Sequence, residues 1–316
     1  MADPVFARLA IIGCGLIGSS LARGARASGA AAEIVIHDAS PFARARIAEL
    51  GLADQVTLSA EEAVTGADLI IFATPVRAIG EAAAACAHAI SPGAIVSDVG
   101  SVKAAVSEAL SAALPDSVHI VPGHVHFVPA HPIAGTEQSG PDAGFAELFH
   151  QRWVILTPQA REDDAYLEAV QRLADFWTAL GAQVERMDDK HHDLVLAVTS
   201  HLPHLIAYNI VGTAADMEEV TRAEVMKYSA GGFRDFTRIA ASDPTMWRDV
   251  FLSNKEATLE VLGRFTEDLQ ALSRAIRWGE GDKLYDLFSR TREIRRGVIE
   301  AGQESAEPDF GRKRGG

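Results

Sequence analysis

Gly13-Cys14-Gly15-Leu16-Ile17-Gly18 matches the pattern G-x-G-x-x-G and stands between two contrasting segments. The apolar run before it, Leu9–Gly13, predicts a buried strand, and the run after it, Leu16–Ser28, predicts a helix. In this setting the first glycine permits a tight turn, the second lets a pyrophosphate approach backbone N–H groups, and the third allows the helix to pack on the strand. The helix N-terminus also favours the phosphate charge. These six residues therefore form a candidate cofactor-binding loop.

A carboxylate follows at the distance that strengthens this interpretation. A second strand is predicted over Glu33–Asp38, and Asp38 ends it about 20 residues beyond the last glycine. A carboxylate there accepts hydrogen bonds from the adenosine ribose and repels a 2′-phosphate, so the sequence predicts NAD in preference to NADP. Arg44 and Arg46, on the next predicted helix, are interpreted as solvated helix charges rather than as ligands of a 2′-phosphate.

Short apolar runs continue to alternate with helical runs, which predicts an α/β fold with a Rossmann-type doubly wound parallel sheet. Thr74 and Pro75, and the loop Asp98–Lys103, follow predicted strands at their carboxyl ends, where open α/β sheets bind ligands. Thr74 and Pro75 therefore join the predicted cofactor site. The further strands are predicted at Asp68–Ala73, Ala94–Asp98, His119–Pro122, Trp153–Thr157 and Gln183–Arg186, and the further helices at Pro41–Leu50, Ala78–Ala89, Lys103–Leu114 and Ala165–Leu180.

After Met187 the strand pattern stops and helical periodicity continues. Asp188 is the expected N-cap of a long helix that leads into Leu194–Val211 and is kinked or broken at Pro203. We expect three parts: a dinucleotide-binding domain over 1–187, an all-α substrate and dimerisation domain over 188–302, and a disordered polar tail over 303–316. Further helices are predicted at Glu218–Tyr228, Pro244–Ser253, Lys255–Arg277 and Asp282–Ala301.

Composition excludes several classes of partner. The chain has 316 residues and a net charge of −14, which argues against nucleic acid or an anionic membrane as a partner. No unbroken apolar run approaches the roughly 18 residues of a membrane span, so a cytoplasmic location is expected. Cys14 and Cys86 lie in a glycine loop and an Ala-rich helical stretch, which favours reduced thiols. The histidine pairs lack a carboxylate or cysteine complement, so no metal site is predicted.

The segment His131–Gly140, HPIAGTEQSG, is predicted to be a loop that joins a possible proton acceptor to polar neighbours. A lone His in a loop usually only satisfies hydrogen bonds, but here several motifs accompany it. Together with the Gly13 loop it resembles the prephenate/arogenate dehydrogenases of tyrosine biosynthesis, in particular the monofunctional cyclohexadienyl dehydrogenases. The resemblance runs from about Leu9 to Ala301 and is carried by three further motifs: Asp98–Lys103 (DVGSVK), Thr199–His204 (TSHLPH) and Gly231–Arg238 (GGFRDFTR).

This resemblance implies an NAD-dependent oxidative decarboxylation of prephenate to 4-hydroxyphenylpyruvate, with arogenate to tyrosine as a second reaction. His131 would take the proton of the ring hydroxyl while hydride leaves the same carbon. Ser101 would orient this histidine and approach the nicotinamide, although on its own it is interpreted as a helix cap. A neutral imidazole near pH 7 is suited to work as a general base.

The resemblance also implies a substrate pocket and a homodimer through the helical domain, whose amphipathic segments need a partner surface. Arg238 would hold a substrate carboxylate, with Arg234 one helical turn earlier as a second cation. The other implied pocket residues are Thr136, Glu137, Ser200, His204 and Trp247, with Trp247 reaching the active site across the dimer. Structural roles remain open for three of them: Glu137 as a solvated carboxylate, and Ser200 and Trp247 as core groups.

One stretch departs from the family pattern, and two other classes of protein stay open as alternatives. The stretch 123–129 is interpreted as an insertion before the His-Pro motif, and it leaves His124 as a weaker rival for the base. A β-hydroxyacid dehydrogenase also joins a Rossmann domain to a helical one, but it would need a catalytic lysine, and Lys190, Lys227 and Lys255 lack the matching glycine context. A non-catalytic NAD-binding sensor would keep its function when His131 is replaced.

Overall fold

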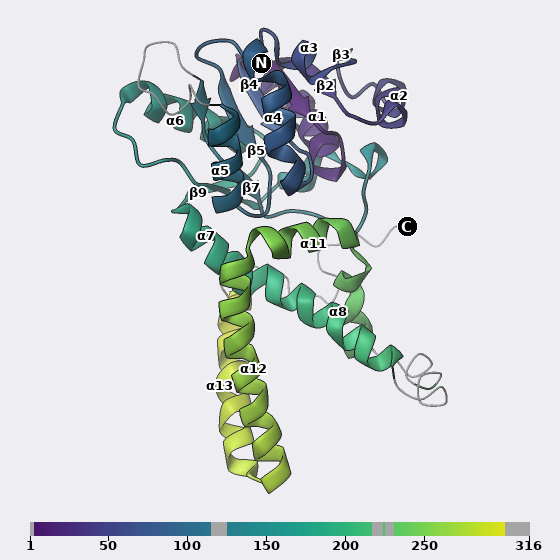
Figure 1. Cartoon of the computed structure of the whole chain (residues 1–316), viewed down its shortest axis with the longest axis vertical. Helices are drawn as coiled ribbons and strands as arrows, with labels where there is room; N and C mark the ends of the chain where they lie inside the picture. Colours follow the sequence, from purple (N-terminus) through teal and green to yellow (C-terminus); the bar gives the residue numbers. More distant parts are fainter. Residues whose placement is uncertain (1–2, 115–124, 217–223, 225–230, 301–316) are drawn as a thin grey trace. The chain divides into compact units, whose positions relative to one another are not determined.

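The computed structural model describes residues 3–114, 125–216, 224 and 231–300 (Figure 1). It divides the chain into two compact units, residues 1–258 and 259–316. The predicted domain boundary at 187/188 falls inside the first unit and stays a prediction. The predicted tail 303–316 and almost all of the predicted helix Glu218–Tyr228 lie outside the described residues.

The first unit is built on a six-stranded parallel sheet with the strand order β3-β2-β1-β4-β5-β6. This is the order of a doubly wound nucleotide-binding sheet, in which the direction of winding reverses between β1 and β4. The predicted fold class is confirmed. The strands are β1 (Phe6–Ile12), β2 (Ala31–His37), β3 (Gln55–Val56), β4 (Leu69–Phe72), β5 (Ile95–Asp98) and β6 (His126–Phe127).

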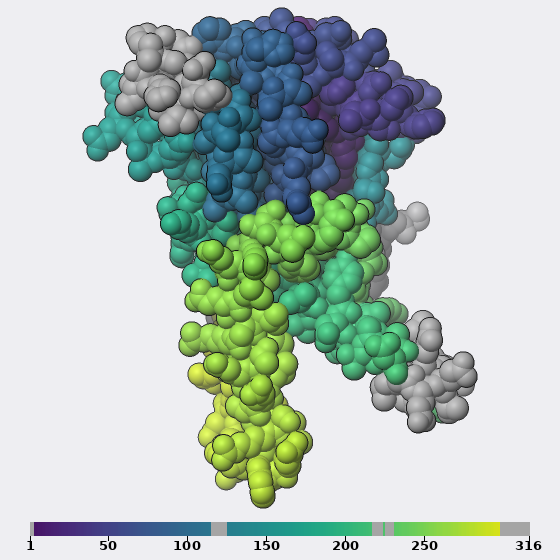
Figure 2. All heavy atoms as spheres, viewed as in Figure 1, coloured from purple at the N-terminus to yellow at the C-terminus, as the bar shows by residue number. Residues whose placement is uncertain are grey.

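Helices cover both faces of this sheet because its central strands are apolar on both sides. Leu9 and Ile11 of β1 pack with α1 and α6, whereas Ala10 and Ile12 pack with α3 and α4 on the opposite face. In Figure 2 the atoms of α4 and α5 form a layer that hides the strands behind them. The helices are α1 (Leu16–Ser28), α2 (Pro41–Glu49), α3 (Ala60–Val64), α4 (Ile79–Cys86), α5 (Ala104–Ala113) and α6 (Asp164–Ala179), with 3₁₀ turns η1 (Val76–Ala78), η2 (Ala87–Ala89), η4 (Pro141–Ala143) and η5 (Ala146–Phe149).

His131 lies on a short strand, not in the loop predicted for it. β7 (Ala130–Pro132) pairs antiparallel with β8 (Trp153–Leu156), which pairs parallel with β9 (Gln183–Arg186), in a separate three-stranded sheet. The two predicted strands that became β8 and β9 are confirmed as strands. The predicted strand His119–Pro122 and the rival base His124 lie outside the described residues, while β6 comes from the stretch interpreted as an insertion.

The helical part of the first unit begins at α7 (Asp189–Leu196), and the predicted N-cap is confirmed. Asp188 accepts hydrogen bonds from the backbone N of Lys190 at 3.0 Å and of His191 at 3.2 Å. A π-helical turn, η6 (Ala197–His201), then joins α7 to α8 (Leu202–Ala215). Pro203 cannot donate to the preceding turn and its ring crowds the carbonyl four residues earlier, a conflict that the wider π turn accommodates. α10 (Gly231–Thr237), η7 (Arg238–Ala241) and α11 (Pro244–Ser253) follow.

α12 (Lys255–Trp278) from residue 259 onward and α13 (Gly281–Glu300) supply the described part of the second unit, and Gly279, with φ 67°, makes the turn between them. These two helices leave large apolar side chains uncovered: Trp278 is 73% exposed and Tyr285 72%. A surface of this kind is typical of an interface with another chain.

One described helical run, Asp189–Ala215, has the length and apolar composition that would let a helix cross a membrane. The criterion is weak, since core helices of water-soluble proteins also meet it. Within this run His192, Asp193 and His201 are buried and hydrogen bonded to His131, Lys103 and Asn254, respectively. Such contacts fit a helix packed against protein.

Candidate functional site

The glycine loop has the geometry that a bound pyrophosphate needs. Gly13 adopts φ +94°, and a Cβ there would lie 2.8 Å from the carbonyl oxygen of Ala73, while a Cβ on Gly18 would lie 2.2 Å from the carbonyl oxygen of Gly13. Only glycine fits at either position. A Cβ on Gly15 would meet nothing within 4 Å, so the backbone there faces open space that a phosphate group can approach. Leu16 and Ile17 begin α1 and anchor it in the core.

Asp38 lies beside this loop, as the sequence predicts. Its Oδ2 accepts a hydrogen bond from the backbone N of Cys14 at 2.9 Å, and its Oδ1 accepts one from the backbone N of Ser40 at 2.9 Å. Each oxygen keeps a further lone pair for a ribose hydroxyl. Arg44 donates to the carbonyl oxygen of Asp38 at 2.6 Å, and Arg46 pairs with Asp142 at 2.6 Å. Both cations thus have partners within the chain, in keeping with a site for NAD.

Thr74 and Pro75 follow β4, and Thr74 touches the position of Gly13. The Thr74 hydroxyl is buried without a hydrogen-bond partner in the described part of the chain, which leaves it available to a ligand. Burial and the nearby Asp38 raise the pKa of the Cys14 thiol to about 12, so this cysteine is an inert core group whose backbone, rather than its sulfur, serves the site.

A buried ion pair ties the end of β5 to the start of β7. Lys103, fully buried, donates through Nζ to the Asp98 carboxylate and, at 2.7 Å, to the carbonyl oxygen of Ala130. Asp98 also accepts from the backbone N of Gly100 at 2.7 Å and of Ala130 at 3.3 Å. His131 is the next residue. The pair therefore positions His131 at the carboxyl edge of the nucleotide-binding sheet, where α/β proteins bind ligands.

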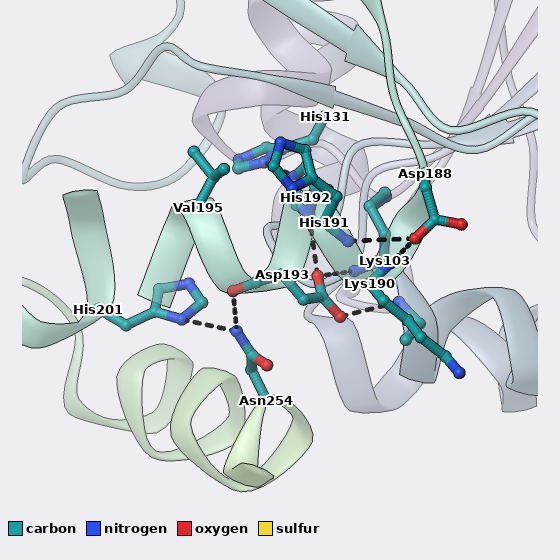
Figure 3. A network of polar contacts seen from close by, with 12 residues as sticks. Lys103, His131, Asp188, Lys190, His191, His192, Asp193, Val195, His201 and Asn254 are labelled. Atoms are coloured by element: carbon teal, nitrogen blue, oxygen red, sulfur yellow. Dashed lines mark hydrogen bonds and ion pairs between the residues drawn. The ribbon is translucent and has the colours of Figure 1, made fainter. Parts of the chain in front are cut away.

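A chain of side chains orients the His131 ring (Figure 3). His131 Nδ1 contacts His192 Nε2 at 2.9 Å, and His192 Nδ1 contacts Asp193 Oδ1 at 2.9 Å. Asp193 in turn accepts from the backbone N of Lys103 at 2.7 Å and of Ala104 at 3.0 Å, which caps the N-terminus of α5. Ser101, predicted to orient His131, is half-buried in the loop before α5. Its predicted role stays a prediction.

His131 is neutral at physiological pH. Burial, then the neighbouring His192, Lys103 and His201, hold its pKa well below the ordinary 6.5, and the side chain is 8% exposed. Burial also lowers the pKa of His192. A neutral imidazole can accept a proton without first losing one, which is the state that a general base requires.

His201 and His204 belong to the same helical wall. Asn254 donates to the carbonyl oxygen of Asp193 at 2.8 Å and contacts His201 Nδ1 at 3.1 Å, while burial lowers the pKa of His201 to about 4. The His204 ring stacks on Trp247 with centroids 3.6 Å apart, and its Nδ1 contacts the carbonyl oxygen of Ser200 at 2.9 Å. Three predicted pocket residues are thus brought together within one chain. The predicted reach of Trp247 across a dimer stays a prediction.

Two more predicted pocket residues meet directly. Arg238, on η7, forms an ion pair with Glu137 at 3.4 Å, and both side chains are partly exposed. Arg234, by contrast, is 77% exposed at its side chain and lies 3.6 Å from Asp235. The hydroxyl of Thr136 accepts from the backbone N of Gln138 at 3.2 Å, which shapes the turn after β7. Of the two predicted cations, Arg238 is thus the one whose side chain lies against another predicted pocket residue, and the role of both in substrate binding stays a prediction.

Five residues of the site have roles that the sequence patterns did not predict: Asp98, Lys103, His192, Asp193 and Asn254. Asp98 and Lys103 lay in a quoted motif, and their opposite charges beside a buried strand were a usable signal. His192 forms a sequence pair with His191, one of the histidine pairs for which no metal site is predicted, and its contact with His131 spans 61 positions in sequence, so local patterns could not reveal it. Among the described ranges no group of three or more metal-ligating side chains converges.

The fold and this site define a nucleotide-binding oxidoreductase with a buried neutral histidine at the ligand edge of its sheet. Two family models match: "Prephenate dehydrogenase, nucleotide-binding domain" over residues 21–186, and "Prephenate dehydrogenase, dimerization domain" over residues 188–290. The chain belongs to the prephenate dehydrogenase family. The resemblance noted in the sequence is thereby confirmed.

Individual relatives agree along nearly the whole chain. A cyclohexadienyl dehydrogenase of Zymomonas mobilis is 46% identical, covering 92% of this chain and 96% of the relative. A prephenate dehydrogenase of Bacillus subtilis is 31% identical over 95% of this chain and 78% of its own. Among solved structures, that of prephenate dehydrogenase from A. aeolicus in complex with hydroxyphenyl propionate and NAD+ has a TM-score of 0.83 at 33% identity, covering 92% of this chain and 98% of its own.

Proposed function

We propose that this protein is a cyclohexadienyl dehydrogenase: it oxidatively decarboxylates prephenate to 4-hydroxyphenylpyruvate with NAD, and accepts arogenate, which gives tyrosine, as a second substrate. The observation that carries the proposal is the buried, neutral His131, held at the carboxyl edge of a nucleotide-binding sheet by Asp98 and Lys103. The family and the 46% identical Zymomonas mobilis relative support the choice of reaction.

NAD fits the residues of the loop. The open space at Gly15 supplies room for a pyrophosphate, the Thr74 hydroxyl, which has no partner among the described residues, supplies a donor, and the carboxylate of Asp38 supplies acceptors for a ribose. A relative of known structure binds NAD+. Bound NAD+ supplies the hydride acceptor of the reaction.

The residues of the chain have distinct tasks in this reaction. His131 removes the proton from the ring hydroxyl as hydride leaves the same carbon, and loss of the ring carboxylate as CO2 makes the ring aromatic. Arg238 holds a substrate carboxylate, because a guanidinium keeps its charge when partly desolvated. Thr136, Glu137, Ser200, His204 and Trp247 would line the pocket around the substrate, and Ser101 would orient the histidine and approach the nicotinamide.

Replacing Arg238 with Ala is expected to raise the KM for prephenate about 10- to 100-fold with a smaller change in kcat, because a charge-assisted bond worth roughly 1.5–3 kcal/mol is lost. Steady-state kinetics at saturating NAD measures both constants. Arg26→Ala is the matched control, since Arg26 forms an exposed pair with Asp54. An unchanged KM in the Arg238 variant would remove this residue from the substrate site.

Cofactor choice is testable at Asp38. The double variant Asp38→Ser, Ala39→Arg is expected to shift the ratio of kcat/KM for NAD over NADP by about 100-fold toward NADP, since it removes a repulsive carboxylate and adds a cation, each worth roughly 1.4 kcal/mol. Ala39 is exposed, so the longer side chain has room. The single variants separate the two contributions. Equal use of both cofactors by the unmodified protein would contradict the role given to Asp38.

The functional division at 187/188 and a homodimer through the helical part belong to the same proposal. The two family matches meet at this boundary, and the second is to a dimerisation domain. Exposed apolar side chains on α8, α12 and α13, among them Val211, Trp278 and Tyr285, supply the surface that a second copy would cover. We assign the enzyme to the cytoplasm, with no nucleic-acid or membrane partner.

An absorbance assay at about 340 nm, where reduced nicotinamide absorbs, tests the activity directly. Purified protein is supplied with NAD or NADP and with prephenate or arogenate. Reduction of NAD with prephenate is the expected result, with arogenate as a slower or equal substrate. No reduction with either substrate would favour the non-catalytic alternative.

A further inference from the structure

The donor and the acceptor of each hydrogen bond in the series Asp193–His192–His131 can be deduced by starting from the Asp193 carboxylate. Both oxygens of Asp193 accept backbone N–H bonds at the start of α5, from Lys103 at 2.7 Å and from Ala104 at 3.0 Å. A carboxylate with both oxygens so engaged offers acceptors only. The 2.9 Å contact from Asp193 Oδ1 to His192 Nδ1 therefore requires a proton on that nitrogen.

The remaining protons are then determined one by one. A neutral imidazole carries one N–H donor and one acceptor, so His192 Nε2 is an acceptor. Its 2.9 Å contact with Nδ1 of His131 requires the proton of His131 to be on Nδ1. His131 Nε2 then carries a lone pair, and no described residue donates a hydrogen bond to it.

We propose that His192 and Asp193 are positioning residues that hold His131 in its Nδ1–H tautomer and so make Nε2 the nitrogen that accepts the substrate proton. This inference rests on the function proposed above. The logic resembles that of a hydrolytic triad, in which a carboxylate selects the tautomer of the base, but here a second imidazole separates the carboxylate from the base.

The surroundings keep this chain in one arrangement (Figure 3). His192 is fully buried on α7, and the Asp193 backbone is held by Asn254 at 2.8 Å. Lys103 anchors the strand that carries His131 and also donates its backbone N–H to Asp193. Supports from α5, β7 and the junction of α11 and α12 thus converge on one imidazole, as outer residues do around a preorganised site.

The proton balance of the step is simple. The O–H bond of the substrate breaks, an N–H bond forms at His131 Nε2, and the hydride leaves for NAD+, so the substrate alcohol is oxidised and the nicotinamide reduced. His131 becomes an imidazolium whose Nδ1–H still points at His192. That hydrogen bond strengthens because its donor is now charged.

The tautomer can be read without any turnover. Full-length protein labelled with ¹⁵N-histidine gives long-range ¹H–¹⁵N correlations that distinguish a protonated Nδ1 from a protonated Nε2, and the His131 signals are those lost in His131→Asn. At neutral pH we expect a protonated Nδ1 and a bare Nε2. A protonated Nε2 would overturn the proposal, whether or not the protein proves to oxidise prephenate.

Kinetics of two His192 variants supply the second arm. His192→Leu, which removes the acceptor, is expected to lower kcat about 100-fold with the KM for NAD within about twofold. His192→Gln offers an amide oxygen to the Nδ1–H of His131 and should recover at least about tenfold of that loss. His191→Leu, at the exposed neighbouring position, is the matched control.

The outcomes separate the possible failures. Equal losses in the Leu and Gln variants, with the His131 tautomer unchanged in both, would assign His192 a packing role and overturn the proposal. Turnover close to that of the unmodified protein in His192→Leu would do the same. If the unmodified protein reduces no NAD with prephenate or arogenate, the proposed function fails, and the NMR result still decides the tautomer.

Discussion

Replacing His131 with Asn is expected to lower kcat at least about 100-fold, the usual contribution of a general base. Asn is close to His in size and can occupy the position beside His192, but its amide cannot accept a proton near neutral pH. The side chain is buried on β7 and its backbone neighbour is held by Asp98 and Lys103, so the fold should survive. Initial rates of NAD reduction with saturating prephenate measure the loss.

Two comparisons make this result specific. NAD affinity, measured by fluorescence or calorimetry, should stay within about twofold, because His131 contributes nothing to the Gly13 loop where the pyrophosphate binds. His88→Asn is the matched control, since His88 is exposed and forms a surface pair with Glu61. Near-normal turnover in the His131→Asn variant would require another base. A loss of NAD binding equal to the loss of rate would point to a folding defect instead.

The second large effect is expected on stability, in Lys103→Met. The substitution leaves the Asp98 carboxylate buried without its counter-charge, a change that costs about 3–5 kcal/mol of unfolding free energy. Asp98 and Lys103 are both fully buried, so water cannot replace the lost partner. Urea unfolding at a fixed protein concentration measures the shift in midpoint. Activity should fall as well, because Lys103 also holds Ala130 beside His131.

Two variants test this explanation. Lys283→Met removes an exposed ion pair with Glu280 and should leave the midpoint nearly unchanged. The double variant Asp98→Asn, Lys103→Met should be more stable than Lys103→Met alone, since no unpaired charge remains in the core. A double variant less stable than the single one would show that the charge of Asp98 is not the source of the cost.

Local sequence patterns were sufficient to predict most secondary-structure elements of the nucleotide-binding part. The glycines of the Gly13–Gly18 loop, the Asp38 carboxylate and the alternation of apolar runs predicted β1, α1, β2, β4 and β5 close to their observed bounds. The reason is that these features depend on neighbours in sequence: strand periodicity, capping and turn conformation act over a few residues. The Asp188 cap and the helices α11 and α12 were predictable for the same reason.

The features that the sequence did not predict, the strand β7 and the side-chain contacts of the site, depend on packing between segments far apart in sequence. The sequence around Ala130–Pro132 does not indicate a strand, because this segment becomes a strand only by pairing with β8. A loop and the turns η4 and η5 separate the two strands in sequence. Motif resemblance predicts His131, Arg238, Trp247 and Glu137 as site residues. It could not reveal that Arg238 pairs with Glu137 or that His204 stacks on Trp247.

The residues proposed for NAD binding and for proton transfer can thus be predicted from the sequence, since each depends on its own chemistry and on a few neighbours. The partners that give His131 a low pKa and a defined orientation cannot be predicted in this way. Burial and hydrogen bonding across 61 positions arise only when α7 packs against β7. Desolvation is a property of the folded surroundings, and no short stretch of sequence carries it.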